Sequence, residues 1–309
     1  MLSRRSHKSR IFCLLLLAII LLFVLRPYPR IHLTKTIQFE HDNGDFGAQL
    51  FSLFSLLGVA QSLDRIPVLN VFNNSELLGR LSQFAAKFPM VFEQYHVVIE
   101  PNSQPNAELG MNSCCYFDDA TEKLSEYTTI DLVVRGKGFR SFKYFHHLRP
   151  EIRHWMLGNA ENVEEARHLL PEHLRPTFKL CVHGSAETDA KFTIIALKRL
   201  LEVYMKEHQQ LTVVMWSMSE HLGQKILNHS RLSNFTMEKF YLPDPSPATQ
   251  LTFSQLYCDA VLLTVPTSTL GWWMGYLAKE ESTVFYANST VTTPEDYFLR
   301  EWKRMFLSK

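Results

Sequence analysis

The chain has 309 residues, 46% of them hydrophobic, with 32 lysines and arginines against 31 aspartates and glutamates. A net charge of +1 argues against a nucleic-acid partner, and the ordinary hydrophobic content argues against a disordered chain. The length predicts one large or two small globular units, each with a full core.

The N-terminal 35 residues differ from the rest of the chain. Residues 1–10 carry four basic side chains and precede an unbroken apolar run at 11–25. Because no small-x-small cleavage site follows, we predict a cytoplasmic tail, an uncleaved signal anchor and a stem at 26–35. This makes a type II single-pass membrane protein with its body in the lumen. The alternative is a cleaved signal peptide and a secreted protein.

Glycosylation sequons and cysteines suit a lumenal body. The four sequons begin at Asn73, Asn228, Asn234 and Asn288. Beside Cys13 in the anchor, the chain has four cysteines whose pairing the sequence leaves open: Cys114, Cys115, Cys181 and Cys258. No C-x-x-C pair and no histidine at zinc spacing occur, so we expect no metal site.

Strand, turn and helix signals follow the stem. A strand at 36–39 leads into a turn with Gly44 and Gly47, then a buried helix at 48–63 and a strand at 66–71. Further along we expect strands at 97–100 and 131–134, a loop at 101–119 between them, and a helix at 149–157.

The chain becomes regular from residue 177. Predicted strands at 178–182, 211–216, 260–265 and 283–286 alternate with helices at 188–206, 220–227, 254–258, 269–278 and 295–306. This alternation predicts an α/β fold with a parallel sheet covered on both faces. Ligands of such sheets bind beyond the carboxyl ends of the strands. We therefore expect the loops after Val182, Trp216 and Val265 to line one crevice.

The segment 265–277 carries the strongest local signal. Ser268 fits a helix N-cap, where backbone N–H groups and the helix dipole favour an anion. Thr269 and the pair Trp272 and Trp273 follow it. We interpret the segment as a phosphate-facing turn backed by aromatic packing. An ordinary capped helix with tryptophans in the core is the alternative interpretation.

Four segments, 44–51, 138–145, 265–277 and 295–302, resemble in their order the α-1,2-fucosyltransferase family, glycosyltransferase family 11. That family has G-R-L-G-N-Q-M-F first, a Y/F-x-Q-S-x-K-Y-F-like segment mid-chain, and S-T-F-G-W-W late. The resemblance implies a divergent Golgi enzyme that transfers fucose from GDP-fucose to a galactose-type acceptor with inversion.

The expected architecture is GT-B-like, with two Rossmann-like halves. We place the acceptor side at 36–176 and the nucleotide-sugar donor side at 177–309. The chain contains no Asp-x-Asp pair, which favours a metal-independent mechanism without a cofactor, in which helix N-termini and basic side chains neutralise the diphosphate. A homo- or hetero-oligomer with related transferases is compatible with this reading.

The ends of the predicted strands and the family resemblance together indicate the residues of the candidate site. The donor-binding candidates are His183, Ser217, Ser268, Thr269 and Trp272. A glycine turn with Gly44, Gly47 and Gln49 is expected to line the cleft from the other half. Asp45 and Glu187 are carboxylates near the predicted crevice, but neither is assigned as the catalytic base, and the catalytic residue stays unknown.

The chain departs from the family pattern where the donor is expected. The family continues its strand as H-x-R-R-G-D, whereas no arginine follows His183 before the next helix. Losing a charge-assisted phosphate contact costs roughly 2–4 kcal/mol. Ser217 stands in Ser-Met-Ser where relatives often have Ser-Asp-Asp, and Asp45 and Ala48 replace family Arg and Asn.

Three accounts of these departures stay open. The chain is a non-catalytic relative that binds a glycan or a nucleotide sugar. It is an active, divergent enzyme that uses Lys191 or Arg140 in place of the missing arginine. Or a segment between Val182 and Lys191 is missing from the sequence through splicing or an incorrect gene model.

Overall fold

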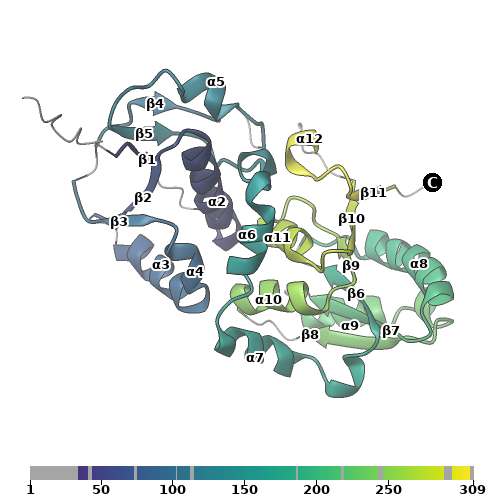
Figure 1. Cartoon of the computed structure of the whole chain (residues 1–309). Coiled ribbons are helices and arrows are strands. Elements are labelled where there is room, and N and C mark those ends of the chain that lie inside the picture. The colour runs from purple at the N-terminus through teal and green to yellow at the C-terminus, as the bar shows by residue number, and fades with distance from the viewer. Residues whose placement is uncertain are drawn as a thin grey trace, which may run out of the picture. The chain divides into compact units, whose positions relative to one another are not determined.

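The computed structural model describes residues 34–40, 44–72, 75–101, 103–111, 115–185, 187–216, 219–242, 246–288 and 294–306 (Figure 1). Apart from Thr34, all of these lie in one compact unit, Lys35–Lys309. Within the described ranges no helix is long and apolar enough to cross a membrane. The predicted anchor at 11–25 lies outside them.

The first sheet has five strands in the order β3-β2-β1-β5-β4, and every pairing is parallel. Its strands are β1 (Thr36–Phe39), β2 (Ile66–Asn70), β3 (His96–Val98), β4 (Ala107–Glu108) and β5 (Asp131–Arg135). Four of them match predicted strands. β4 lies in the predicted loop at 101–119, because a pair of residues is too short to show a strand pattern. It forms by pairing with Val134 and Arg135 of β5.

Helix α2 (Phe46–Ser62) follows β1 and confirms the predicted buried helix. It begins one residue after its N-cap, Asp45, and most of its residues are buried on both sides of the helix. The predicted helix at 149–157 is also present, as α6. The remaining helices between β2 and the second sheet are α3 (Ser75–Lys87), α4 (Pro89–Phe92), α5 (Ala120–Leu124), η1 (Phe142–Tyr144), η2 (His146–Leu148), α6 (Arg149–Trp155), α7 (Ala160–Leu169) and η3 (Glu172–Leu174).

The second sheet has six parallel strands in the order β11-β10-β9-β6-β7-β8. They are β6 (Phe178–His183), β7 (Leu211–Trp216), β8 (Glu238–Leu242), β9 (Ala260–Leu263), β10 (Thr283–Ala287) and β11 (Lys303–Met305). The helices of this part are α8 (Ala190–Glu207), α9 (Glu220–Leu227), η4 (Ser230–Leu232), α10 (Pro247–Tyr257), α11 (Thr269–Leu277) and α12 (Pro294–Tyr297).

Alternate residues of β6 enter two different cores. Leu180 and Val182 pack with α8, whereas Cys181 lies in the cluster that contains the tryptophans of α11. Because successive strand residues point to opposite faces, this alternation confirms a parallel sheet covered on both sides.

Two helix predictions in this part had the wrong bounds. The helix predicted at 254–258 is the end of the longer α10, which Ser246 caps by accepting a hydrogen bond from Thr249 N. Its buried threonines hid the helical pattern, since Thr249 and Thr252 are hydrogen-bonded to α7 through Asn162.

The helix predicted at 295–306 ends at Tyr297. Residues 303–305 instead form β11, in parallel register with β10, so that Phe285 opposes Lys303. The strand forms because its backbone groups pair with those at the open edge of β10. Such a pairing cannot be recognised from the local sequence.

The cysteine pairing left open by the sequence is partly decided. Cys181 in β6 and Cys258 after α10 form a disulfide with Cα atoms 5.6 Å apart. Cys115 is also disulfide-bonded, to a partner outside the described residues.

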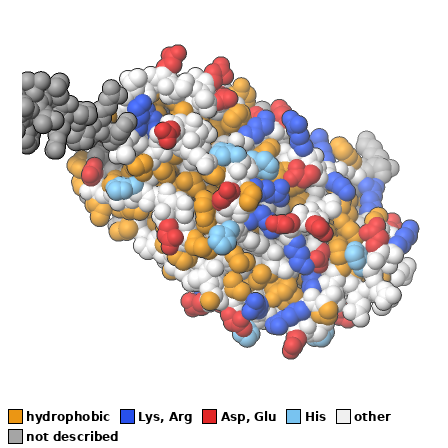
Figure 2. Space-filling view, viewed as in Figure 1, with side chains coloured by type: hydrophobic (Ala, Val, Ile, Leu, Met, Phe, Trp, Pro, Cys, Tyr) orange, Lys and Arg blue, Asp and Glu red, His pale blue; other side chains and the backbone are white. Residues whose placement is uncertain are grey.

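On the surface shown in Figure 2, acidic and basic side chains are interspersed with hydrophobic ones. This mixture agrees with the near-neutral net charge of the chain.

Candidate functional site

The first turns of α2 and α11 meet through one carboxylate. Asp45 Oδ1 accepts a hydrogen bond from Ala48 N at 2.8 Å, which caps α2. The same oxygen accepts a hydrogen bond from Thr269 Oγ1 at 2.6 Å, in the first turn of α11. The glycine-turn motif and the Ser-Thr-Leu-Gly-Trp-Trp motif, more than 200 residues apart, are therefore in direct contact.

Gly47 lets the two helices approach this closely. Its carbonyl accepts a hydrogen bond from Trp273 Nε1 at 2.9 Å. A Cβ atom built on Gly47 would lie 2.6 Å from both Leu270 N and Thr269 Oγ1. The backbone of Gly47 thus covers the Leu270 amide, one of the N–H groups that a diphosphate would otherwise reach.

We expect Gly47→Ala to lower the free energy of unfolding by about 2 kcal/mol, because the added methyl group overpacks two backbones that cannot both move. Urea unfolding followed by circular dichroism measures it. Gly79→Ala is the matched control: Gly79 lies in α3 with nothing within 4 Å of an added Cβ, so alanine there should stabilise by about 0.5–1 kcal/mol. Equal stabilities for Gly47→Ala and the wild type would contradict the close contact.

The second and fourth motifs are joined in the same way. Ser141 Oγ donates to the carbonyl of Asp296 at 2.6 Å, and Lys143 forms an ion pair with the Asp296 carboxylate. The other carboxylate oxygen of Asp296 accepts from Phe117 N at 3.1 Å. Ser55 of α2 donates to the carbonyl of Phe139 at 2.9 Å, which ties the first motif to the second.

Trp272 does not line the cleft. Its side chain is fully buried, and its Nε1 donates to the carbonyl of Tyr297 at 2.7 Å. It packs against Phe51, Tyr276 and Trp302. The expectation that Trp272 contacts the donor is therefore corrected to a packing role, because residues of the three other motifs, Phe51, Phe145 and Trp302, pack around the indole.

The remaining candidates in the α11 turn are only partly available. Ser268 confirms its predicted N-cap position by accepting from Gly271 N at 3.2 Å, and it is half-exposed. Thr269 is buried, with its hydroxyl on Asp45. Thr267, just before them, is exposed. A ligand can thus reach this turn from the side of Thr267 and Ser268.

His183 ends β6 behind the same turn. It is 4% exposed, and a Cβ on Gly271 would lie 2.7 Å from its Nδ1, so the ring packs against the first turn of α11. No described residue forms a hydrogen bond with Nδ1. Burial lowers the pKa of His183 to about 4, which makes the ring neutral at pH 7. His183 therefore supplies no positive charge for a diphosphate.

The loops after β6 and β9 contact each other, as the strand order predicts. Thr264 Oγ1 donates to the carbonyl of His183 at 2.7 Å, and the hydroxyls of Thr188 and Thr264 are 3.2 Å apart. Glu187 and Lys191 are exposed nearby in the chain, Lys191 in the first turn of α8. Ser217, in the loop after β7, lies outside the described residues.

Arg140 supplies a positive charge at the junction of the motifs. It is half-buried, and no described residue forms an ion pair or hydrogen bond with its guanidinium. Burial raises the pKa of Tyr297, while Arg140 lowers it and Asp45 raises it, so both charges act on the Tyr297 hydroxyl. Of the two replacements proposed for the missing arginine, Arg140 thus lies in a segment that contacts α2, because the carbonyl of the preceding Phe139 accepts a hydrogen bond from Ser55.

Gln49 is half-exposed in the first turns of α2, and its Nε2 donates to the carbonyl of Gly44 at 3.0 Å. This bond closes the glycine turn. The sequence alone did not indicate that Asp296 and Tyr297 bridge the motifs. The signal in the sequence was the pair of adjacent polar side chains, Asp296 and Tyr297, within the mostly aromatic fourth motif.

Solved structures show the class of fold. The chain is similar to a crystal structure of NodZ α-1,6-fucosyltransferase soaked with GDP-fucose, with a TM-score of 0.52 and 16% identity over 79% of this chain and 93% of that one. A second structure of fucosyltransferase NodZ, from Bradyrhizobium, matches with a TM-score of 0.50. Together with the two parallel sheets, this defines a GT-B-like α/β fold.

Sequence relatives identify the family within this fold class. A galactoside 2-α-L-fucosyltransferase of Caenorhabditis elegans is 32% identical over 88% of this chain and 77% of its own length. An uncharacterized protein of the same nematode is 41% identical over 98% of this chain and 97% of its own length. The chain belongs to the galactoside 2-α-L-fucosyltransferase family, as its motifs indicated. No protein-family model matches it.

Proposed function

We propose that the chain is a type II membrane enzyme of the Golgi that transfers fucose from GDP-fucose to a galactose-type acceptor with inversion. Family membership at 32% identity supports a fucosyltransferase, and the NodZ structure that shares the fold was soaked with GDP-fucose. The acceptor oxygen would bond to the anomeric carbon of fucose as the bond from that carbon to the diphosphate breaks, so that GDP leaves and the hydroxyl proton is released.

The observation that carries this proposal is the position of Arg140. A guanidinium grips phosphate oxygens bidentately and keeps its charge at all relevant pH values. Arg140 lies between Phe139, whose carbonyl accepts a hydrogen bond from Ser55 of α2, and Ser141, whose hydroxyl donates to Asp296, and no described residue forms an ion pair with it. We therefore assign to Arg140 the contact with the donor diphosphate that an arginine after His183 makes in the family.

A lumenal position is supported by two features. The Cys181–Cys258 disulfide suits an oxidising compartment. The sequon asparagines at 228, 234 and 288 are exposed and accessible to glycosylation, while Asn73 lies outside the described residues. Metal independence and the membrane anchor remain parts of the proposal.

A second candidate function, a non-catalytic binding protein, has one observation in its favour. Gly47 covers the Leu270 amide, and Asp45 occupies the Thr269 hydroxyl where the family carries an arginine. Both features remove groups that would bind phosphate. Donor affinity therefore separates the two functions.

Calorimetric titration of GDP-fucose into the full-length chain, with and without a chelator, tests the donor site. We expect binding that survives the chelator, and a loss of about 30-fold in affinity, about 2 kcal/mol, in Arg140→Ala. Arg231→Ala is the matched control, since Arg231 is an exposed arginine of η4, a segment that belongs to none of the four motifs. A folded wild type that binds no GDP-fucose would favour the non-catalytic function.

A further inference from the structure

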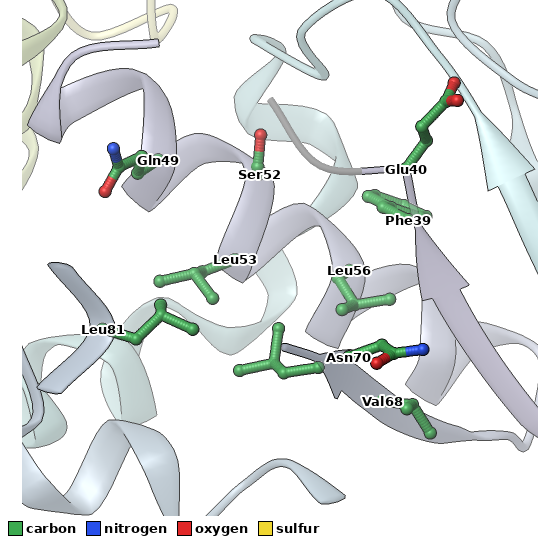
Figure 3. A pocket seen from close by; sticks show the side chains of 10 residues that line it. Phe39, Glu40, Gln49, Ser52, Leu53, Leu56, Val68, Asn70 and Leu81 are labelled. Carbon is green, nitrogen blue, oxygen red and sulfur yellow. The ribbon is translucent and has the colours of Figure 1, made fainter. Parts of the chain in front are cut away.

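A pocket in the first half of the chain lies at the carboxyl ends of β1 and β2 (Figure 3). Its cavity volume is about 60 Å³. Its apolar lining comes from Phe39, Leu53, Leu56, Val68, Leu69 and Leu81. Because ligands of parallel sheets bind beyond the carboxyl ends of the strands, this is a position where a substrate is expected.

One face of α2 forms a wall of the pocket. Gln49, Leu53 and Leu56 follow each other at intervals of four and three residues, so they line the same side of the helix. Phe51, on another side, packs against the tryptophans of α11. The helix therefore connects the pocket with the junction at Asp45, one turn before Gln49.

The polar groups of the pocket are mostly engaged within the protein. Glu40 pairs with Arg135 at 3.1 Å, and the Asn70 amide donates to the carbonyl of Glu100 at 3.0 Å. The Gln49 amide donates to Gly44. Among the buried polar atoms of the lining, Ser52 Oγ has no hydrogen-bond partner in the described residues. This leaves few donors and acceptors for the many hydroxyl groups of a sugar ring.

Aromatic stacking on a sugar is restricted in the same pocket. Phe39, its one aromatic lining residue among those described, stacks on Phe139 with ring centroids 3.9 Å apart. The other apolar lining residues are leucines and a valine. Their contacts with alkyl groups are non-directional. The lining thus suits a hydrocarbon rather than a second sugar.

We propose that this pocket binds an alkyl group attached to the acceptor sugar, so that the preferred acceptor is an alkyl glycoside of the glycolipid type. The inference rests on the proposed function, because it places the acceptor sugar between the pocket and the donor at the junction of α2 and α11. The alkyl group fills the space between α2 and β2, and the sugar lies toward Gln49 and the glycine turn.

Calorimetric titration of the full-length chain in detergent with hexyl β-galactoside and with methyl β-galactoside tests this inference. We expect the hexyl compound to bind at least tenfold more tightly, because burial of about two methylene groups suffices for that factor. The same samples are titrated with GDP-fucose. Its binding reports the donor site separately, so failure of the alkyl pocket and failure of the proposed function are distinguishable.

Two variants fill the pocket from opposite walls: Leu69→Trp from β2 and Ser52→Phe from α2. Each should reduce the preference for hexyl over methyl β-galactoside below about threefold and leave GDP-fucose binding unchanged. If one variant fails to fold, the other provides the test. Leu78→Trp, at an exposed position of α3 outside the lining, is the matched control and should keep the preference. Equal affinities for both galactosides, or a preference that persists in both filled variants, would overturn the inference.

Discussion

Replacing Cys181 and Cys258 together by alanine should lower the free energy of unfolding by about 4 kcal/mol. The disulfide joins β6 to the residue that follows α10, across a sequence separation of 77 residues. Without it the unfolded chain gains the conformational entropy of that long loop, while the folded chain keeps nearly the same contacts. Both cysteines are fully buried, so the lost sulfur contacts act in the same direction.

Urea unfolding of the oxidised wild type and the double variant measures this loss. Peptide mapping by mass spectrometry without reductant establishes that the bond is present in the wild type. Ser254→Ala is a suitable comparison, since Ser254 is also buried in α10 and its hydroxyl donates a hydrogen bond to Met274 O. Its cost should be about 1 kcal/mol. A wild type with free thiols, and a double variant of equal stability, would contradict the disulfide and weaken the case for a lumenal body.

Acidification should destabilise the protein through His183. Burial lowers the pKa of His183 to about 4 in the folded state, against an ordinary value of 6.5 in the unfolded chain. Above pH 6.5 the ring is neutral in both states and carries no penalty. As the pH falls from 6.5 toward 4, the unfolded chain binds a proton that the folded chain does not, so stability is lost over this window. Each pH unit costs up to about 1.4 kcal/mol, and the total approaches about 3 kcal/mol.

The free energy of unfolding should be measured at pH 7 and pH 4.5 for the wild type and for His183→Gln. The variant should lose less stability between the two pH values, although it is less stable at pH 7 because the ring packs on Gly271. The same measurement on His96→Gln, at an exposed position of β3, is the control for replacing a histidine. Identical pH dependence in His183→Gln and the wild type would show that His183 is not buried as a neutral ring.

The donor site shows why patterns among neighbouring residues predict only part of a binding site. Ser268 was recognised as an N-cap, because its hydroxyl bonds the amide of Gly271, three residues on. The engagement of Thr269 with Asp45 could not be recognised, because the two residues are separated by 224 positions. The burial of Trp272 could not be recognised either, because Phe51 and Phe145, which pack against its indole, lie far from it in the sequence.

The sequence by itself determined the alternation of strands and helices, the buried helix after the glycine turn, the parallel order of the second half, and the family. These follow from hydrophobic periodicity, caps and short motifs, which are written in neighbouring residues. Tertiary structure alone decided the Cys181–Cys258 pairing, the strand at 303–305 in place of a helix, and the closure of Gly47 over α11. Each of these depends on a contact between segments distant in the chain, where packing and hydrogen-bond satisfaction outweigh local preference.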